Sequence, residues 1–283
     1  MGSDTPGHPE LHKNGEMIMQ RRELLIGLTV LSALTLAGCG DKKTETEIKL
    51  GTLSGPHAEV AEVAAKVAAA KGLKIKIVEF SDYGHVNEAL AAKDIDVNAF
   101  QHVPYLKKAI AQKGYPFTPL GKTVLFPLGV YSLKIHSINE IADGMLVTVP
   151  ADPANLGRAL QLLERNGLIT LRAGTGVHAT THDIIANPKH LEFREVDSAY
   201  LGRSLPDVGF AVINGSWAVK SNLSPAKDAF ILEDGKYAFS NVLVVRTEDK
   251  DKAVFKTLQA AFQSPEVKQF VLDKFKGSVV PAF

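Results

Sequence analysis

Short apolar runs alternate with helical patterns along the chain from Ile48 onward. The apolar runs have the length and the alternation that are typical of strands, and the stretches between them have the apolar spacing of helices. In the first part of the chain the expected strands are residues 48–53, 74–80 and 95–100, and the expected helices are residues 57–72, 83–93 and 104–114. Strands that alternate with helices in this way predict a parallel sheet.

The middle of the chain repeats this order. The expected strands are residues 145–150, 191–196 and 209–214, and the expected helices are residues 151–167 and 200–205. A last strand at 241–248 and two helices at 250–263 and 265–277 follow. One strand and two helices are too little to bury a core of their own, so we expect them to fold back on the first unit.

These patterns predict a two-lobed α/β protein in which each lobe is a mostly parallel sheet flanked by helices. Lobe 1 is expected over residues 48–131 plus 242–283 and lobe 2 over residues 132–241, with the extended segment 129–137 crossing between them. Small ligands commonly bind in the cleft between two such lobes.

The N-terminal part has a different pattern. Arg21 and Arg22 precede an apolar stretch, residues 24–37, that ends in small residues before Cys39. This is the pattern of a secretory signal, and the stretch is shorter than the roughly 20 residues that span a bilayer. Because LAGC at 36–39 resembles a bacterial lipobox, we expect Cys39 to be lipidated; a plain signal peptide or a buried free thiol are the alternatives.

Residues 1–38 are thus interpreted as a leader and lipoprotein signal peptide, and residues 39–47 as a polar tether. We expect the protein to be anchored by lipid to the cell membrane, on the extracytoplasmic (periplasmic) side. Each acyl methylene buried in the bilayer contributes about 0.8 kcal/mol to this anchoring. With 32 Lys plus Arg against 31 Asp plus Glu, the chain lacks the charge of a nucleic-acid-binding protein.

Polar and aromatic side chains follow the carboxyl ends of the expected strands, where ligands bind in open α/β sheets. The candidate ligand-binding residues are Tyr83, Phe100, His102, Tyr105, Arg158, Asn214 and Asn241. Taken singly, each has an ordinary interpretation, such as a core ring for Phe100, a structural histidine for His102 or a solvated charge for Arg158. Their shared position at strand ends favours a site.

This set of side chains suits a zwitterionic amino acid with an apolar tail. The guanidinium of Arg158 can bind a carboxylate through parallel hydrogen bonds, and the amide oxygens of Asn214 and Asn241 can accept hydrogen bonds from an ammonium group. The aromatic residues can enclose a flexible side chain. A thioether would gain about 0.3–1.5 kcal/mol from each contact between its sulfur and a ring.

Several segments resemble the NlpA family of methionine-binding lipoproteins, which are the substrate-binding subunits of methionine ABC importers. They are FQHVPYL at 100–106, DPANLGRALQLLERNGLI at 152–169, FAVINGSWA at 210–218, ILEDGKYAFSNVLVVR at 231–246 and KGSVVPAF at 276–283. The resemblance implies a periplasmic-binding-protein-like fold that closes on methionine, with Arg158 on the carboxylate, Asn214 and Asn241 on the polar head, and the rings around the thioether. It also implies an ABC permease and its ATPase subunits as partners.

The sequence departs from the family pattern at Ser216 and Trp217, so another apolar amino acid or a methionine derivative is an alternative ligand. No cofactor and no metal are expected. The spacing of His178 and His182 would suit a metal on one helix face, but no third ligand is evident. An enzyme with His102 or His182 as a base is a weaker alternative, because the sequence has no nucleophile motif or paired carboxylates.

Overall fold

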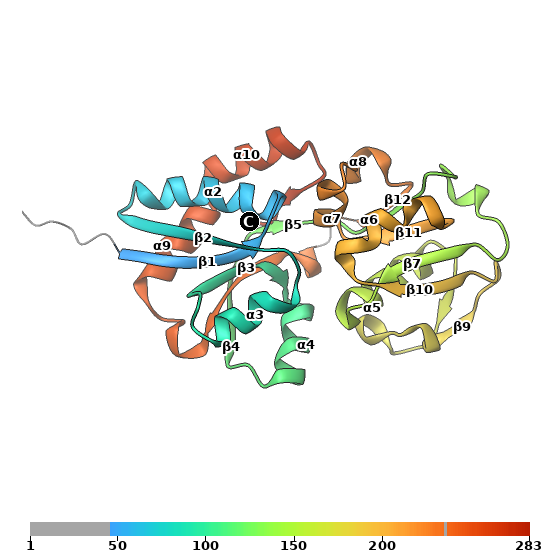
Figure 1. Cartoon of the computed structure of the whole chain (residues 1–283), viewed down its shortest axis with the longest axis horizontal. Coiled ribbons are helices and arrows are strands. Elements are labelled where there is room, and N and C mark those ends of the chain that lie inside the picture. Colours follow the sequence, from blue (N-terminus) through green and yellow to red (C-terminus); the bar gives the residue numbers. More distant parts are fainter. Residues whose placement is uncertain (1–45, 235–236) are drawn as a thin grey trace, which may run out of the picture. The chain divides into compact units, whose positions relative to one another are not determined.

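Two five-stranded sheets, each covered by helices, organise the computed structural model, which describes residues 46–234 and 237–283 (Figure 1). The expected leader, the lipidation site at Cys39 and residues 39–45 of the expected tether lie outside the described residues. Thr46 and Glu47 were expected in the tether, but they begin the first strand, where each pairs with a residue of the neighbouring strand.

The first sheet has the strand order β2-β1-β3-β13-β4. Its strands are β1 (Thr46–Leu53), β2 (Leu73–Phe80), β3 (Val97–His102), β4 (Phe117–Lys122) and β13 (Asn241–Arg246). β1 pairs in parallel with β2 and β3, whereas β13 is antiparallel to β3 and β4. The strand from the far end of the sequence therefore lies in the middle of the sheet, with its first residue, Asn241, opposite His102.

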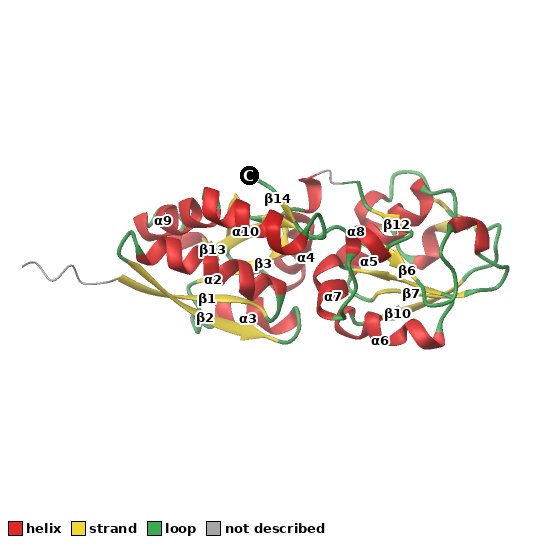
Figure 2. Cartoon of the chain, turned by 90° about the horizontal axis from the view of Figure 1, so that it is seen from above, coloured by secondary structure: helices red, strands yellow, loops and turns green. Residues whose placement is uncertain are grey.

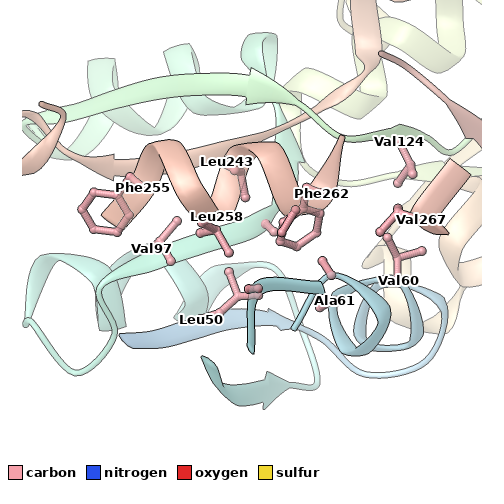
Figure 3. Packing of buried hydrophobic residues seen from close by; sticks show 14 of the residues in the cluster. Leu50, Val60, Ala61, Val97, Val124, Leu243, Phe255, Leu258, Phe262 and Val267 are labelled. Atoms are coloured by element: carbon pink, nitrogen blue, oxygen red, sulfur yellow. The ribbon is translucent and has the colours of Figure 1, made fainter. Parts of the chain in front are cut away.

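Helices cover both faces of the first sheet. They are α2 (Pro56–Ala69), α3 (Gly84–Ala91), α4 (Val103–Lys113), α9 (Ala253–Phe262) and α10 (Pro265–Phe275). On one face, α2, α9 and α10 enclose a core in which Leu50, Leu243 and Leu258 are fully buried (Figure 3). On the other face, Leu90 of α3 and Leu106 of α4 pack around Phe100. The C-terminal strand and helices thus share a core with the N-terminal part.

The second sheet has the order β10-β7-β11-β6-β12. Its strands are β6 (Gly129–Tyr131), β7 (Leu146–Pro150), β10 (Glu192–Val196), β11 (Phe210–Ile213) and β12 (Ile231–Leu232), and its helices are α5 (Pro153–Arg165), α6 (Leu201–Ser204), α7 (Gly215–Lys220) and α8 (Pro225–Asp228) (Figure 2). β7 is parallel to β10 and β11, whereas β6 is antiparallel to β11 and β12. Val147, Leu160 and Phe210 form part of its buried core.

Shorter elements complete the chain. The two-stranded pairs are β5 (Val124–Leu125) with β14 (Val280–Pro281) and β8 (Thr170–Leu171) with β9 (Ile184–Ala186). The 3-10 helices are Ile138–Glu140, Gly176–His178, Thr181–Asp183, Ser198–Tyr200, Leu205–Asp207, Tyr237–Phe239 and Thr247–Asp249. Among the described residues, no helix combines the length and the apolar character needed to cross a membrane.

The structure refines the sequence expectations in two respects. The sheets are mostly parallel, as expected, but each is mixed, because one strand, β13 in the first sheet and β6 in the second, runs opposite to the other four. The boundaries between the sheets also shift: residues 129–131, expected in lobe 1, form β6 of the second sheet, and Asn241, expected in lobe 2, begins β13 of the first. The first crossing therefore precedes Gly129 instead of running through residues 129–137.

Candidate functional site

All seven residues expected to bind a ligand line one pocket. The cavity that they enclose is small, about 20 Å³. Five further residues complete its lining: His57, Gln101, Phe126, Asn155 and Ser216. Residues from both sheets and from the segment between β5 and β6 thus meet in one place.

The end of β3 positions the first group of pocket residues. All six residues of this strand are buried, so its polar side chains need partners inside the protein. The amide of Gln101 provides one such network, because its Nε2 donates to Asn87 Oδ1 at 2.7 Å and to Asn98 Oδ1 at 3.0 Å. This network holds the strand end rigidly, which fixes the neighbouring Phe100 and His102.

His102 is the N-cap of α4 and connects this helix to α5. Its Nδ1 accepts a hydrogen bond from the backbone N–H of Tyr105 at 3.2 Å, so Nε2 carries the proton and donates to Asn155 Oδ1 at 3.1 Å. The Nδ2 group of Asn155 donates in turn to Asp152, the N-cap of α5. Burial, aided by the charge of Arg158, lowers the pKa of His102 to about 3, and the ring is neutral at pH 7.

Four rings form one wall of the pocket region. Tyr83 lies 6.0 Å from Phe100, 5.7 Å from Tyr105 and 5.8 Å from Trp217 between ring centroids, and Phe100 meets Tyr105 edge-on at 5.8 Å. These separations are within the favourable range for aromatic pairs. Burial raises the pKa of the Tyr83 hydroxyl, so it remains protonated. The wall is therefore uncharged.

Asn241 and His57 form the polar side opposite β3. The Nδ2 group of Asn241 donates to the backbone carbonyl of Phe100 at 3.0 Å and lies 3.0 Å from His57 Nε2. The His57 ring lies against Phe126 at 4.2 Å, and burial lowers its pKa to about 3. Because both hydrogens of the Asn241 amide have partners, its Oδ1 is oriented as an acceptor.

Arg158 is buried and paired. The side chain is 3% exposed, so the ordinary interpretation of a solvated surface charge is wrong. Its Nε donates to Glu233 Oε1 at 2.9 Å, and its Nη2 donates to Glu233 Oε2 and to the carbonyl of Phe126 at 3.0 Å. The ring of Phe239 lies 4.4 Å from the guanidinium carbon. This geometry fixes the guanidinium firmly in the pocket lining.

The remaining polar candidate, Asn214, follows β11. Its Oδ1 accepts a hydrogen bond from the Ser198 hydroxyl at 3.2 Å. Gly215 follows it directly, and a Cβ at that position would lie 2.4 Å from the carbonyl oxygen of Pro127. Only glycine therefore allows the start of α7 to approach the crossing segment so closely.

Comparison with known proteins identifies the family of this chain. Residues 48–283 match the sequence profile of the family described as NlpA lipoprotein. The chain belongs to the NlpA lipoprotein family. The D-methionine-binding lipoprotein MetQ of Salmonella typhimurium is 45% identical over 89% of this chain and 94% of its own length. That of Escherichia coli K12 is 43% identical with the same coverage.

A solved structure extends this comparison. A nutrient-binding protein from Burkholderia cenocepacia, bound to methionine, is 46% identical and superimposes with a TM-score of 0.82, over 83% of this chain and all of that one. A structure of MetQ is 43% identical with a TM-score of 0.81 over 83% of this chain. The NlpA lipoprotein described here therefore has the two-lobed α/β fold of periplasmic binding proteins, as the sequence predicted.

The two residues expected to depart from the family pattern, Ser216 and Trp217, lie at the pocket and directly behind it. Ser216 lines it directly, whereas Trp217 packs behind Tyr83 and is 5% exposed. The Lys220 ammonium lies 4.9 Å from the Trp217 ring and donates to Ser54 Oγ at 2.6 Å. The tryptophan thus acts on the pocket through Tyr83 rather than by lining it.

The spacing of His178 and His182 does not place them on one helix. They lie in two separate 3-10 turns, Gly176–His178 and Thr181–Asp183. The second turn is closed by Asp183, whose carboxylate accepts from the backbone N–H and the hydroxyl of Thr180. The geometry required for a metal site on one helix face is absent from this segment.

Sequence reasoning missed several pocket residues and one residue behind them. His57 and Phe126 lie just after β1 and β5, so the rule of strand ends could have identified them. Glu233 carried no such signal, because it is 75 positions from Arg158 and only the folded chain brings the two together.

Proposed function

We propose that this protein is a lipid-anchored, extracytoplasmic substrate-binding protein that captures methionine, in the L or D form, and delivers it to an ABC importer. The observation that carries this proposal is the meeting of a buried guanidinium, oriented amides and a wall of rings in one small pocket. The names of its close relatives and the methionine bound to the related Burkholderia cenocepacia protein support the same ligand.

The ligand's two charged groups and its side chain would meet different parts of the pocket. Arg158 would bind the carboxylate, with each charge-assisted hydrogen bond contributing about 1.5–3 kcal/mol. Asn241 would accept from the ammonium through its oriented Oδ1, with Asn214 close to the same end. Tyr83, Phe100, His102 and Tyr105 would enclose the thioether, whose sulfur suits ring contacts.

Capture would proceed by closure of two lobes, lobe 1 around the first sheet and lobe 2 around the second. Hydrogen bonds connect the lobes at the pocket, where His102 donates to Asn155 at 3.1 Å, and outside its lining, where Lys220 donates to Ser54 at 2.6 Å and the hydroxyls of Ser224 and Ser278 lie 3.0 Å apart. A ligand that contacts both lobes stabilises the closed form by its higher affinity for that form. The closed protein would then present its cargo to a permease whose ATPase subunits supply the energy.

The anchor would be the acylated Cys39 at the start of the mature chain, on the periplasmic side of the membrane. This position suits a protein that hands its ligand to a membrane-embedded permease. In this role the protein is a binding protein and not an enzyme.

Calorimetry on ligand-stripped mature protein tests the proposal, with L-methionine, D-methionine and the other standard amino acids as titrants. Micromolar or tighter binding of methionine, which corresponds to about 8 kcal/mol, is expected. Tighter binding of another apolar amino acid or of a methionine derivative would redirect the ligand assignment. Absence of binding to any of them would refute the proposal.

A further inference from the structure

Glu233 lies behind the pocket, and both oxygens of its carboxylate accept hydrogen bonds. Its side chain is 4% exposed, and its two oxygens accept from Nε and Nη2 of Arg158. Oε2 also accepts from the backbone N–H of Leu128 at 3.2 Å, while the Glu233 backbone N–H donates to the Leu128 carbonyl at 2.8 Å. This carboxylate is therefore held to the segment between β5 and β6 as well as to the guanidinium.

The pairing leaves one part of the guanidinium for a ligand. Nε and Nη2 are committed to Glu233 and to the Phe126 carbonyl, and the ring of Phe239 lies against the group. Among the described residues, no hydrogen bond is found at Nη1. Since Arg158 lines the pocket and Glu233 does not, the ligand would meet Nη1 with its orientation set from behind.

The pairing also sets the charge of the pocket. Burial keeps His57 and His102 neutral at pH 7, and the remaining lining residues other than Arg158 are uncharged types. The positive charge of Arg158 is offset by Glu233 in direct contact. Asp152 lies behind Asn155 and also interacts with Arg158, while burial raises the pKa of its carboxyl.

We propose that Glu233 is a specificity-determining residue that orients Arg158 and cancels its charge, so that the pocket selects zwitterionic α-amino acids over carboxylates that lack an ammonium group. This inference rests on the proposed function. A buried guanidinium without Glu233 would attract any carboxylate and would repel an ammonium group nearby. With the pair intact, the zwitterion meets a guanidinium whose positive charge is offset by Glu233.

The sign of the effect follows from the ligand charges. Replacing Glu233 by glutamine makes the charge beside the pocket more positive by one unit. That charge favours the carboxylate of methionine and of its desamino analogue, 4-(methylthio)butanoate, to the same degree. It disfavours the ammonium, which only methionine carries. The preference for methionine over the desamino analogue should therefore decrease.

The experiment compares Glu233→Gln with the wild type and with Glu192→Gln, which changes an exposed glutamate on β10. The dissociation constants of L-methionine and 4-(methylthio)butanoate are measured by calorimetry on ligand-stripped protein. In Glu233→Gln the dissociation constant of 4-(methylthio)butanoate divided by that of L-methionine should fall about tenfold or more, because the effective dielectric near buried pairs is low. Glu192→Gln should keep the wild-type ratio.

A purely structural role of Glu233 would weaken both ligands by the same factor and leave the ratio unchanged, and that result would overturn the inference. Should Glu233→Gln fail to fold, the wild type provides the test through methioninamide, which keeps the ammonium but lacks the carboxylate. A balanced site should not prefer the anion to this cation by more than about tenfold. A stronger preference would mean that the charge of Arg158 is not offset, contrary to the inference.

The same titrations separate this inference from the proposed function. If the wild type binds no methionine, the proposed function fails and the inference fails with it. If the wild type binds methionine and the ratio does not respond to Glu233→Gln, the inference alone is wrong.

Discussion

His102 donates its Nε2–H to Asn155 Oδ1 over 3.1 Å, which joins the end of β3 to the first turn of α5. The two side chains are 5% and 2% exposed, so water does not compete for the bond. The tautomer of His102 is fixed on one side by Tyr105 N–H, and the orientation of Asn155 is fixed on the other by Asp152. Hydrogen bonds between the side chains of His102, Asn155 and Asp152 therefore connect the first lobe to the second.

Asn155→Ala should destabilise the protein by about 1–3 kcal/mol, because it leaves the buried His102 N–H without an acceptor. Urea unfolding of the two proteins, followed by circular dichroism, measures the difference. Asn139→Ala changes an exposed asparagine in the 3-10 helix Ile138–Glu140 and should leave the free energy of unfolding within about 0.5 kcal/mol of the wild type. Equal stabilities for both variants would show that the bond contributes nothing.

Asn241→Ala should weaken methionine binding about tenfold or more, because it removes the oriented amide oxygen and the contacts to Phe100 and His57. Calorimetry measures the affinity, and a thermal melt confirms that the variant is folded. An unchanged dissociation constant in a folded variant would place the ammonium elsewhere in the pocket.

Arg158→Ala should be destabilising by about 3–5 kcal/mol, since it leaves the carboxylate of Glu233 buried without its partner. Replacing both residues together, Arg158→Met with Glu233→Leu, should recover most of this loss, because well-packed apolar residues often substitute for a buried ion pair at little cost. Urea unfolding of the single and double variants tests this. A double variant as unstable as the single one would argue that the loss comes from packing and not from the unpaired charge.

The stability should fall as the pH is lowered from about 6.5 toward 3. The folded protein keeps His57 and His102 neutral down to about pH 3, whereas in the unfolded chain they bind protons below about 6.5. The unfolded state therefore takes up more protons in this window, and each histidine should reduce the free energy of unfolding by about 1.4 kcal/mol per pH unit.

Urea unfolding at a series of pH values measures this slope. His102→Gln should reduce it, because one of the two contributions is removed, whereas His182→Gln, at an exposed position in a 3-10 turn, should leave it as in the wild type. An equal slope in all three proteins would mean that His102 does not contribute to it.

The sequence predicted much of the fold because local pattern decides it. Proline in the first turn and the apolar spacing located α4 and α5 to within a few residues. The mixed character of the sheets was not predictable in the same way. The direction of β6 and β13 depends on how the two crossings enter each sheet, and no local pattern carries that information.

The candidate site was partly predictable for the same reason. Polar and aromatic residues near the strand ends of both sheets line one pocket, so the rule of strand ends identified all seven candidates. Their individual roles toward a ligand stay a prediction. Glu233 was not predictable, because its effect depends on a contact between residues that are distant in sequence.

Trp217 provides an intrinsic fluorescence signal for ligand binding. It is the single tryptophan of the sequence, it is nearly shielded from water, and it meets Tyr83 edge-on at the pocket wall. The intrinsic fluorescence of the protein therefore originates beside the ring that a ligand would touch. Emission can report occupancy in real time, without an attached dye, in stopped-flow records of both association and release.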